Sequence, residues 1–210
     1  MNKKKKIILI IILILLIISI FLLLGYNYYK GNNDKKTYKQ EDSIKGYNYT
    51  LDDRDTKLMK DTFKKLKSTL NKEDIDYKEY AILLSELYII DIFTIDNKIN
   101  KYDTPSLEYI LEDNKENFSN NISDTLYKYL IDNSDNSRKQ DLPIVESIKY
   151  TNIEESTYTY KDTEYNGYKV SLNWTYKKDY GYDDSAIIDV INKDNKLYIV
   201  GYEGVNNEEN

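Results

Sequence analysis

The sequence predicts an α+β domain that follows an N-terminal transmembrane helix. An apolar run near the N-terminus is long enough to cross a bilayer, the next part of the chain repeats its apolar residues at helical spacing, and the last part alternates them as strands do. Helices that precede a set of antiparallel strands usually cover one face of a single sheet. We therefore expect about three helices packed on a curved antiparallel sheet of about four strands.

The N-terminal run has the features of a membrane anchor. Lys3 to Lys6 precede apolar residues from Ile7 to Leu24, which only Ser19 interrupts. At about 1.5 Å per residue, such a helix spans about 27 Å, close to the hydrocarbon thickness of a bilayer. Lysines stay on the cytoplasmic side. We expect residues 1–6 to be a cytoplasmic tail and residues 7–25 a single-pass signal-anchor in the plasma membrane, with the C-terminal domain extracellular.

A cleaved signal peptide is the alternative interpretation of this run. Signal peptides have a shorter apolar region of about 7–15 residues, which ends in small residues of an A-x-A type. Here the run ends in the sequence LLLGY, which offers no such site, and the chain contains no cysteine to carry a lipid. The pattern therefore favours a retained anchor over a secreted product.

The composition argues against several classes of function. The chain has 30 basic and 36 acidic residues, and without Lys3 to Lys6 the balance is 26 against 36, or −10. This charge disfavours nucleic acid as a partner, because phosphate contacts need a positive surface. Histidine and cysteine are both absent, which excludes Ser-His-Asp triads, Cys-His pairs and the usual zinc sites. We expect no cofactor and no metal.

The segment between the anchor and the domain is expected to be a flexible stalk. Residues 26–50 are polar, contain several glycines and asparagines, and follow no sustained period. The alternative is that this segment packs on the domain. We expect the domain itself over residues 51–203, and a disordered acidic tail over residues 204–210.

Three helices are expected at the start of the domain. The second has a capping box, in which Asp76 accepts a hydrogen bond from the amide of Glu79, and an apolar face broad enough to predict burial on more than one side. The third is expected to be capped by Asp113 and Glu116. The apolar positions of the first and third helices are Met59, Phe63, Leu66 and Leu70, and Phe118, Ile122, Leu126 and Leu130.

The apolar period changes to two in the last third of the chain. The alternating set that predicts a half-buried strand is Tyr168, Val170, Leu172, Trp174 and Tyr176. Asn166-Gly167 precedes this strand and suits a type I′ hairpin turn, fed by a strand through Tyr158 and Tyr160. The sheet therefore includes at least one hairpin before residue 177.

A second hairpin is expected at the end of the domain. It joins a strand over Ala186–Ile191 to one over Leu197–Tyr202 through Asp194-Asn195. Another strand, over Leu142–Tyr150, is expected to enter the sheet after the polar loop of residues 133–141.

This order of elements resembles the nuclear transport factor 2-like (cystatin-like cone) fold, over about residues 53–203. The segment LYIIDIFTIDNKINKYD, from Leu87 to Asp103, is also similar to a stretch in uncharacterised membrane-anchored proteins of clostridia and related low-GC Gram-positive bacteria. Those proteins have glycines after Asp103, where this chain has Thr104-Pro105-Ser106. The resemblance implies one of three roles: dehydratase or isomerase chemistry, ligand binding in the cone, or scaffolding, as in type IV secretion and conjugation machines.

Asp91 is the main candidate for chemistry, because it lies on the apolar face of the second helix, four residues after Leu87. The resemblance implies that such an aspartate acts as a general base, with a tyrosine such as Tyr88 polarising a carbonyl. The alternative is that Asp91 bonds a neighbouring hydroxyl or amide and only sets packing. The residues expected to line a ligand cavity are Tyr80, Tyr88, Asp91, Tyr109 and Trp174.

Two further groups of side chains have a simple structural interpretation. The first is an oxygen-rich stretch that could hold calcium, but it lacks the EF-hand spacing and glycine, which favours a helix exit and turn. Its residues are Asp96, Asn97, Asn100 and Asp103. The second is the tyrosine-rich sheet, which we interpret either as core or as an aromatic contact surface. Its tyrosines are residues 150, 158, 160, 165, 168, 176, 180 and 182.

Together these features predict a non-enzymatic interaction or scaffold domain of a cell-envelope assembly, such as a secretion or conjugation system. Its expected partners are the membrane, through residues 7–25, and either an envelope protein or a second copy of the chain. A module that binds a small apolar ligand is the first alternative. A lyase or isomerase that uses Asp91 as its general base is the second.

Overall fold

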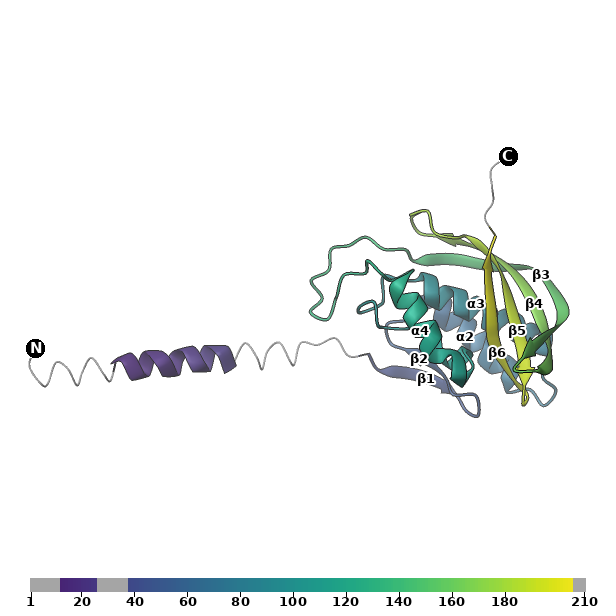
Figure 1. Cartoon of the computed structure of the whole chain (residues 1–210), viewed down its shortest axis with the longest axis horizontal. Coiled ribbons are helices and arrows are strands. Elements are labelled where there is room, and N and C mark those ends of the chain that lie inside the picture. Colours follow the sequence, from purple (N-terminus) through teal and green to yellow (C-terminus); the bar gives the residue numbers. More distant parts are fainter. Residues whose placement is uncertain (1–11, 26–37, 206–210) are drawn as a thin grey trace, which may run out of the picture. The chain divides into compact units, whose positions relative to one another are not determined.

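The computed structural model describes residues 12–25 and 38–205 (Figure 1). The chain divides into two units: residues 1–37 with 133–138, and residues 38–132 with 139–210. In the first unit, residues 12–25 form a helix. Among the described residues, no helix has both the length and the apolar character needed to span a membrane. The expected tail over residues 1–6, the start of the expected anchor and residues 206–210 of the expected acidic tail lie outside the described residues.

Part of the expected stalk belongs to the folded domain, so the prediction of a stalk up to residue 50 is wrong. Strands β1 (Gln40–Ile44) and β2 (Tyr49–Asp52) pair as an antiparallel hairpin. Ile44 and Tyr49 are 2% and 0% exposed, so this hairpin is part of the core. Strands of four and five residues are too short for their alternation to be recognised in a polar segment.

The first two predicted helices are confirmed. Helix α2 spans Lys57–Leu70, and α3 spans Tyr77–Phe93, capped by the Asp76 side chain, which accepts from the amides of Lys78 and Glu79. Every residue of α3 from Tyr80 to Phe93 is buried except Asp91, as the broad apolar face predicts. This helix packs on α2 and on the strands of the sheet, which explains why it has no polar stripe (Figure 1).

The third predicted helix is shorter than expected and begins differently. Two 3₁₀ turns, η1 (Leu107–Tyr109) and η2 (Glu112–Asn114), lead into α4 (Lys115–Asp124). The N-cap residue of α4 is Asn114, and it makes no side-chain capping bond. Asp113 lies before it in η2 and forms an ion pair with Lys161 instead of capping the helix. The helix ends where the Thr125 hydroxyl donates to the carbonyl of Asn121, a local bond that competes with helix continuation.

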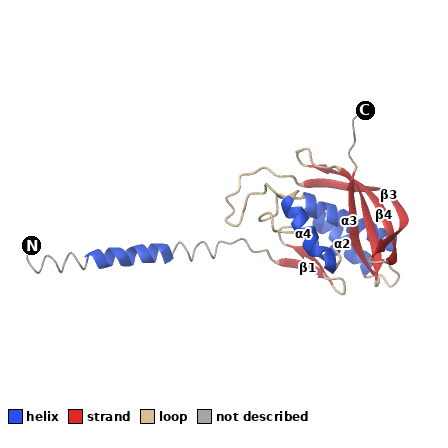
Figure 2. Ribbon diagram, in the orientation of Figure 1, coloured by secondary structure: helices blue, strands red, loops and turns tan. Residues whose placement is uncertain are grey.

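The α+β class is confirmed by a four-stranded antiparallel sheet whose strands follow one another in the order β3-β4-β5-β6 (Figure 2). The strands are β3 (Val145–Tyr160), β4 (Thr163–Tyr176), β5 (Ser185–Lys193) and β6 (Lys196–Gly204). The sheet curves around the helices, with β3 and β6 at its edges (Figure 1). In β4, Val170, Leu172 and Trp174 are buried, as predicted from their alternation.

The two hairpin turns of the sheet differ in how well the sequence predicts them. Asp194 and Asn195 form the turn between β5 and β6, as expected, with φ of 55° and 62°. Asn166-Gly167 is not a turn: both residues lie within β4, and the chain reverses at Lys161-Asp162 instead. Gly167 lets the backbones of β4 and β5 approach closely, because a Cβ there would lie 1.9 Å from the carbonyl oxygen of Val190.

Candidate functional site

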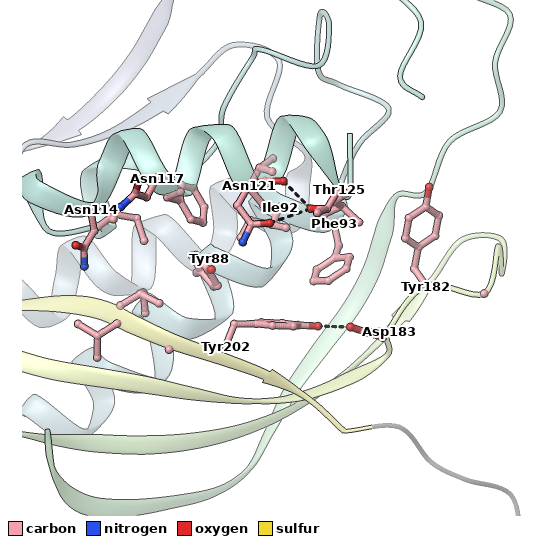
Figure 3. A pocket seen from close by; sticks show the side chains of 18 residues that line it. Tyr88, Ile92, Phe93, Asn114, Asn117, Asn121, Thr125, Tyr182, Asp183 and Tyr202 are labelled. Carbon is pink, nitrogen blue, oxygen red and sulfur yellow. Dashed lines mark hydrogen bonds between the residues drawn. The ribbon is translucent and has the colours of Figure 1, made fainter. Parts of the chain in front are cut away.

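A pocket of about 640 Å³ lies between α4 and the edge strand β6, beside the C-terminal part of α3 (Figure 3). Ile92, Phe93, Phe118, Ile122 and Ile199 give it apolar walls. These residues come from three different elements, which the packing of α4 over the end of α3 brings together. A concave site with apolar walls and a few polar groups is the usual form of a small-molecule site.

Three carboxamides line the α4 side of the pocket. Asn114, Asn117 and Asn121 are spaced three and four residues apart, so they follow one face around the start and body of α4 (Figure 3). The Oδ1 of Asn114 accepts from the Tyr160 hydroxyl at 3.3 Å, and that of Asn121 accepts from Thr125 at 3.2 Å. This row presents neutral donors and acceptors to the pocket and no charge.

Tyr88 brings a hydroxyl into the pocket from α3 (Figure 3). Its ring packs against Phe118, with 6.2 Å between ring centroids. Burial raises the pKa of the Tyr88 hydroxyl above its ordinary value, so it stays neutral at physiological pH. Tyr88 therefore presents a neutral hydroxyl to the pocket, which can both donate and accept hydrogen bonds.

The strand side of the pocket ends in an aromatic cluster around Asp183. The Tyr202 hydroxyl donates to the Asp183 carboxylate at 2.6 Å, and the Tyr176 hydroxyl donates to the Asp183 carbonyl at 2.6 Å. The indole of Trp174 donates to Tyr176 in turn, at 2.8 Å. Burial, and then the bond to Asp183, raise the pKa of Tyr202. This chain of hydrogen bonds fixes the loop that carries Asp183 beside the pocket.

Asp91 does not line the pocket, although it lies only three residues from Tyr88. Its carboxylate accepts from Lys98 Nζ at 2.5 Å and from Ser106 Oγ at 2.8 Å. The Lys98 side chain is 1% exposed, so it is committed to this ion pair. Ser106, three residues after Asp103, has a left-handed backbone, with φ of 59°. These contacts support the interpretation that Asp91 sets packing.

Three other predicted lining residues belong to the core. Tyr80 bonds the Tyr49 hydroxyl and accepts from the Leu197 amide at 3.2 Å. Tyr109 is 0% exposed, and its hydroxyl has no hydrogen-bond partner among the described residues. Trp174 lies behind Phe93, with 5.2 Å between ring centroids. Of the five predicted cavity residues, only Tyr88 lines the pocket.

The oxygen-rich stretch from Asp96 to Asp103 has the character of a turn. The Asp103 carboxylate accepts from the Ile99 amide at 2.8 Å, which closes the turn, and it also binds the Arg54 guanidinium. Arg54 occupies both oxygens of this carboxylate. Asp103 therefore takes part in a structural ion pair that links the turn to the end of the first hairpin.

The pocket residues that sequence reasoning missed come from α4 and from the end of the sheet. Asn114, Asn117 and Asn121 carried a detectable signal, because their spacing places them on one helix face. Asp183 and Tyr202 carried none, since only the pairing of β5 with β6 brings them together. Comparison with protein-family models, with curated proteins and with solved structures finds no match for this chain.

A separate cluster of carboxyl groups lies near Tyr109. Burial, and then the charge of Asp91, raise the pKa of Glu108 to about 7, although Thr50 donates to it from its amide and hydroxyl, each at 3.4 Å. Burial also raises the pKa of Asp55 to about 6. These groups hold protons in the folded protein at a pH where the unfolded chain has already lost them.

We expect Glu108→Gln to stabilise the domain by about 2 kcal/mol at pH 8 and by little at pH 5. Glu108 has its ordinary pKa of 4.5 in the unfolded chain and about 7 in the folded protein. The stability of the wild-type domain therefore falls as pH rises from about 4.5 to 7, because the folded state alone binds the proton there. Urea unfolding at both pH values measures this difference.

The matched control is Glu112→Gln, which changes an exposed carboxylate in the neighbouring η2 turn. We expect it to alter stability by less than about 1 kcal/mol at either pH. An equal effect of Glu108→Gln at pH 5 and pH 8 would show that this carboxyl group does not hold a proton in the folded protein.

Proposed function

We propose that the domain is a non-enzymatic binding module whose pocket between α4 and β6 holds a small, largely apolar molecule. The observation that carries this proposal is the cavity itself, about 640 Å³ in volume, with apolar and aromatic walls. Binding sites for small molecules commonly have volumes of about 300–1,000 Å³ and a few polar groups that orient the ligand. Tyr88, the asparagine row of α4 and the Tyr202–Asp183 pair supply such groups.

The geometry favours binding over catalysis. General acid–base chemistry needs a group of suitable pKa within reach of the reacting atom. Tyr88 is held neutral by burial, and Asp91, the candidate base, bonds Lys98 and Ser106 outside the pocket. Asp183 is exposed at the pocket end and accepts a hydrogen bond from Tyr202. This arrangement can orient a ligand through hydrogen bonds and charge.

The proposed setting is the outer face of the plasma membrane. The lysines at positions 3–6 and the apolar run over residues 7–25 support a single-pass anchor with the N-terminus inside the cell. The order of two helices, a short connecting segment, a further helix and consecutive antiparallel strands supports a nuclear transport factor 2-like domain. A tethered binding module would sample ligands at the cell surface.

A scaffold in an envelope assembly is the second candidate, and β3 favours it. This strand is 16 residues long and lies at the edge of the sheet, with β4 as its one neighbouring strand in the sheet. Most of its side chains are exposed, and Tyr150 is 45% exposed. A strand from an envelope protein or from a second copy of the chain would extend the sheet there.

Filling the pocket tests the leading proposal. We expect the full-length protein to bind the neutral dye Nile red in a saturable way, and Asn117→Trp to weaken this binding at least about tenfold, since the indole would occupy the space that the ligand needs. Dye fluorescence measures the affinity. Asn117 is exposed on α4, so the larger side chain is expected to leave the fold intact.

Glu116→Trp is the control, because Glu116 is exposed on α4 but does not line the pocket. It should bind the dye as the wild type does. Equal binding by all three proteins, or saturable binding by none, would contradict a ligand site between α4 and β6. Either result would leave the β3 edge as the better-supported basis for function.

A further inference from the structure

We propose that the pocket selects an organic cation, namely a quaternary or protonated amine with a small apolar body. The cationic group would lie against the rings of Tyr202 and Tyr182 and beside the Asp183 carboxylate (Figure 3). This inference rests on the proposed function of the pocket as a ligand site, and it adds the chemical class of the ligand.

The charge of the pocket favours a cation. Among the residues that line it, Asp183 alone has an acidic side chain, and none has a basic one. In the described part of the chain, Asp183 forms no ion pair, and its one side-chain partner is the Tyr202 hydroxyl, bound to Oδ2. The Oδ1 atom is therefore available to an incoming donor, and an anion would find no countercharge in this pocket.

The aromatic rings supply a second attraction for positive charge. Five of the lining residues are aromatic: Tyr88, Phe93, Phe118, Tyr182 and Tyr202. The face of an aromatic ring attracts a cation within about 6 Å of its centroid. Elsewhere in the domain such faces are already occupied by protein cations, as where Lys196 lies 4.6 Å from the Tyr49 ring and Arg54 lies 4.2 Å from that of Tyr38.

The pocket rings have no such partner. Among the described residues, no lysine or arginine lies over any of the five rings that line the pocket. The aromatic rings and a carboxylate without an ion pair therefore occur together in one place, and both favour the same kind of ligand.

The cluster is also held in position before a ligand arrives. Phe93 packs against both Trp174 and Tyr202, with 5.2 Å and 6.0 Å between ring centroids. The Tyr176 hydroxyl anchors the backbone of Asp183, and the Tyr176 ring lies 6.4 Å from that of Tyr182. A site with fixed side chains loses less conformational entropy when it binds.

The same chemistry separates two sources of a quaternary ammonium group. A phosphocholine headgroup brings a phosphate close to its ammonium, and no basic side chain lines the pocket to receive that phosphate. A free amine, such as choline, carries no such penalty. We therefore commit to a ligand with a cationic group and no phosphate.

The fluorescence of Trp174 measures binding. This residue is the only tryptophan of the chain, and it packs on Phe93, which lines the pocket. The full-length protein, in neutral maltoside detergent, is titrated with choline, with its uncharged carbon isostere 3,3-dimethylbutan-1-ol, and with phosphocholine. We expect choline to bind at least about tenfold more tightly than the isostere, and phosphocholine more weakly than choline.

Two variants assign the effect to Asp183. Asp183→Asn should lower the affinity for choline to about that for the isostere, which is about a tenfold loss. Asp184→Asn, which changes the neighbouring exposed carboxylate outside the pocket, should bind choline as the wild type does. Thermal unfolding of both variants verifies that they are folded, since neither side chain is part of the core.

The possible outcomes are distinguishable. Equal binding of choline and its isostere, or an unchanged ratio in Asp183→Asn, overturns the cation inference while the binding pocket stands. Binding of Nile red without binding of choline has the same meaning. Failure of every probe, the dye included, overturns the proposed function together with this inference.

Discussion

Replacing Arg54 with methionine is expected to destabilise the domain by about 3 kcal/mol at pH 7, as measured by urea unfolding. The guanidinium of Arg54 binds both oxygens of Asp103, and its Nε lies 3.4 Å from the Asp52 carboxylate. The side chains of Arg54 and Asp103 are 16% and 17% exposed. Methionine retains most of the alkyl stem of arginine. The loss of stability therefore measures the cost of leaving the Asp103 carboxylate partly buried without its countercharge.

The effect should depend on pH in a defined direction. Burial raises the pKa of Asp103, but the hydrogen bonds and charge of Arg54 outweigh burial and hold this pKa below the ordinary 3.8. The stabilisation is therefore complete above about pH 4 and is lost as pH falls through the lowered pKa. The difference between wild type and Arg54→Met should accordingly become smaller in strongly acidic solution.

Lys60→Met is the matched control, since it removes the more exposed ion pair with Glu41. We expect it to cost less than about 1 kcal/mol. If Lys60→Met and Arg54→Met destabilised the domain equally, burial of the Arg54–Asp103 pair would not increase its contribution to the free energy of unfolding.

Gly167→Ala is expected to destabilise the domain by about 3 kcal/mol, because the new methyl group would overlap the backbone of β5. The added Cβ would lie 1.9 Å from the Val190 carbonyl oxygen and 2.9 Å from Ile191 Cα, so the two strands must separate. Circular dichroism during urea unfolding measures the loss. Asn166→Ala, at an exposed neighbour in the same strand, should change stability by less than about 1 kcal/mol. Similar stability of both variants would argue against close packing of β4 on β5 at this point.

The role of Gly167 cannot be predicted from its neighbours in the sequence alone. Asparagine followed by glycine favours a type I′ turn, but a glycine within a strand equally serves a close backbone approach. Only the position of β5 decides between these roles, and that position depends on distant residues. The chain turns instead at Lys161-Asp162. Both residues have positive φ, a conformation that lysine and aspartate adopt less readily than glycine. By contrast, the burial of Val170, Leu172 and Trp174 is predictable from the sequence, because these three residues follow a period of two.

The same distinction explains which parts of the site could be predicted. The sequence indicates Tyr88 because a hydroxyl group stands out in a helix as apolar as α3. Asp91 stands out for the same reason, but its partners Lys98 and Ser106 come from the segment after the helix, where the sequence follows no period. Asp183 and Tyr202 are 19 positions apart and meet only through strand pairing. The sequence therefore revealed the helix side of the pocket better than the strand side.

The position of α3 has a consequence for how the domain opens. This helix contacts α2 on one side and strands of the sheet on the other, and nearly all its side chains are buried between them. Its amide hydrogens can exchange with solvent only when both layers separate, which amounts to loss of the whole core. We therefore expect the α3 amides to exchange through global unfolding, and those of the half-exposed α4 to exchange through local opening. We therefore expect α4, the outer wall of the pocket, to open while the rest of the domain remains folded.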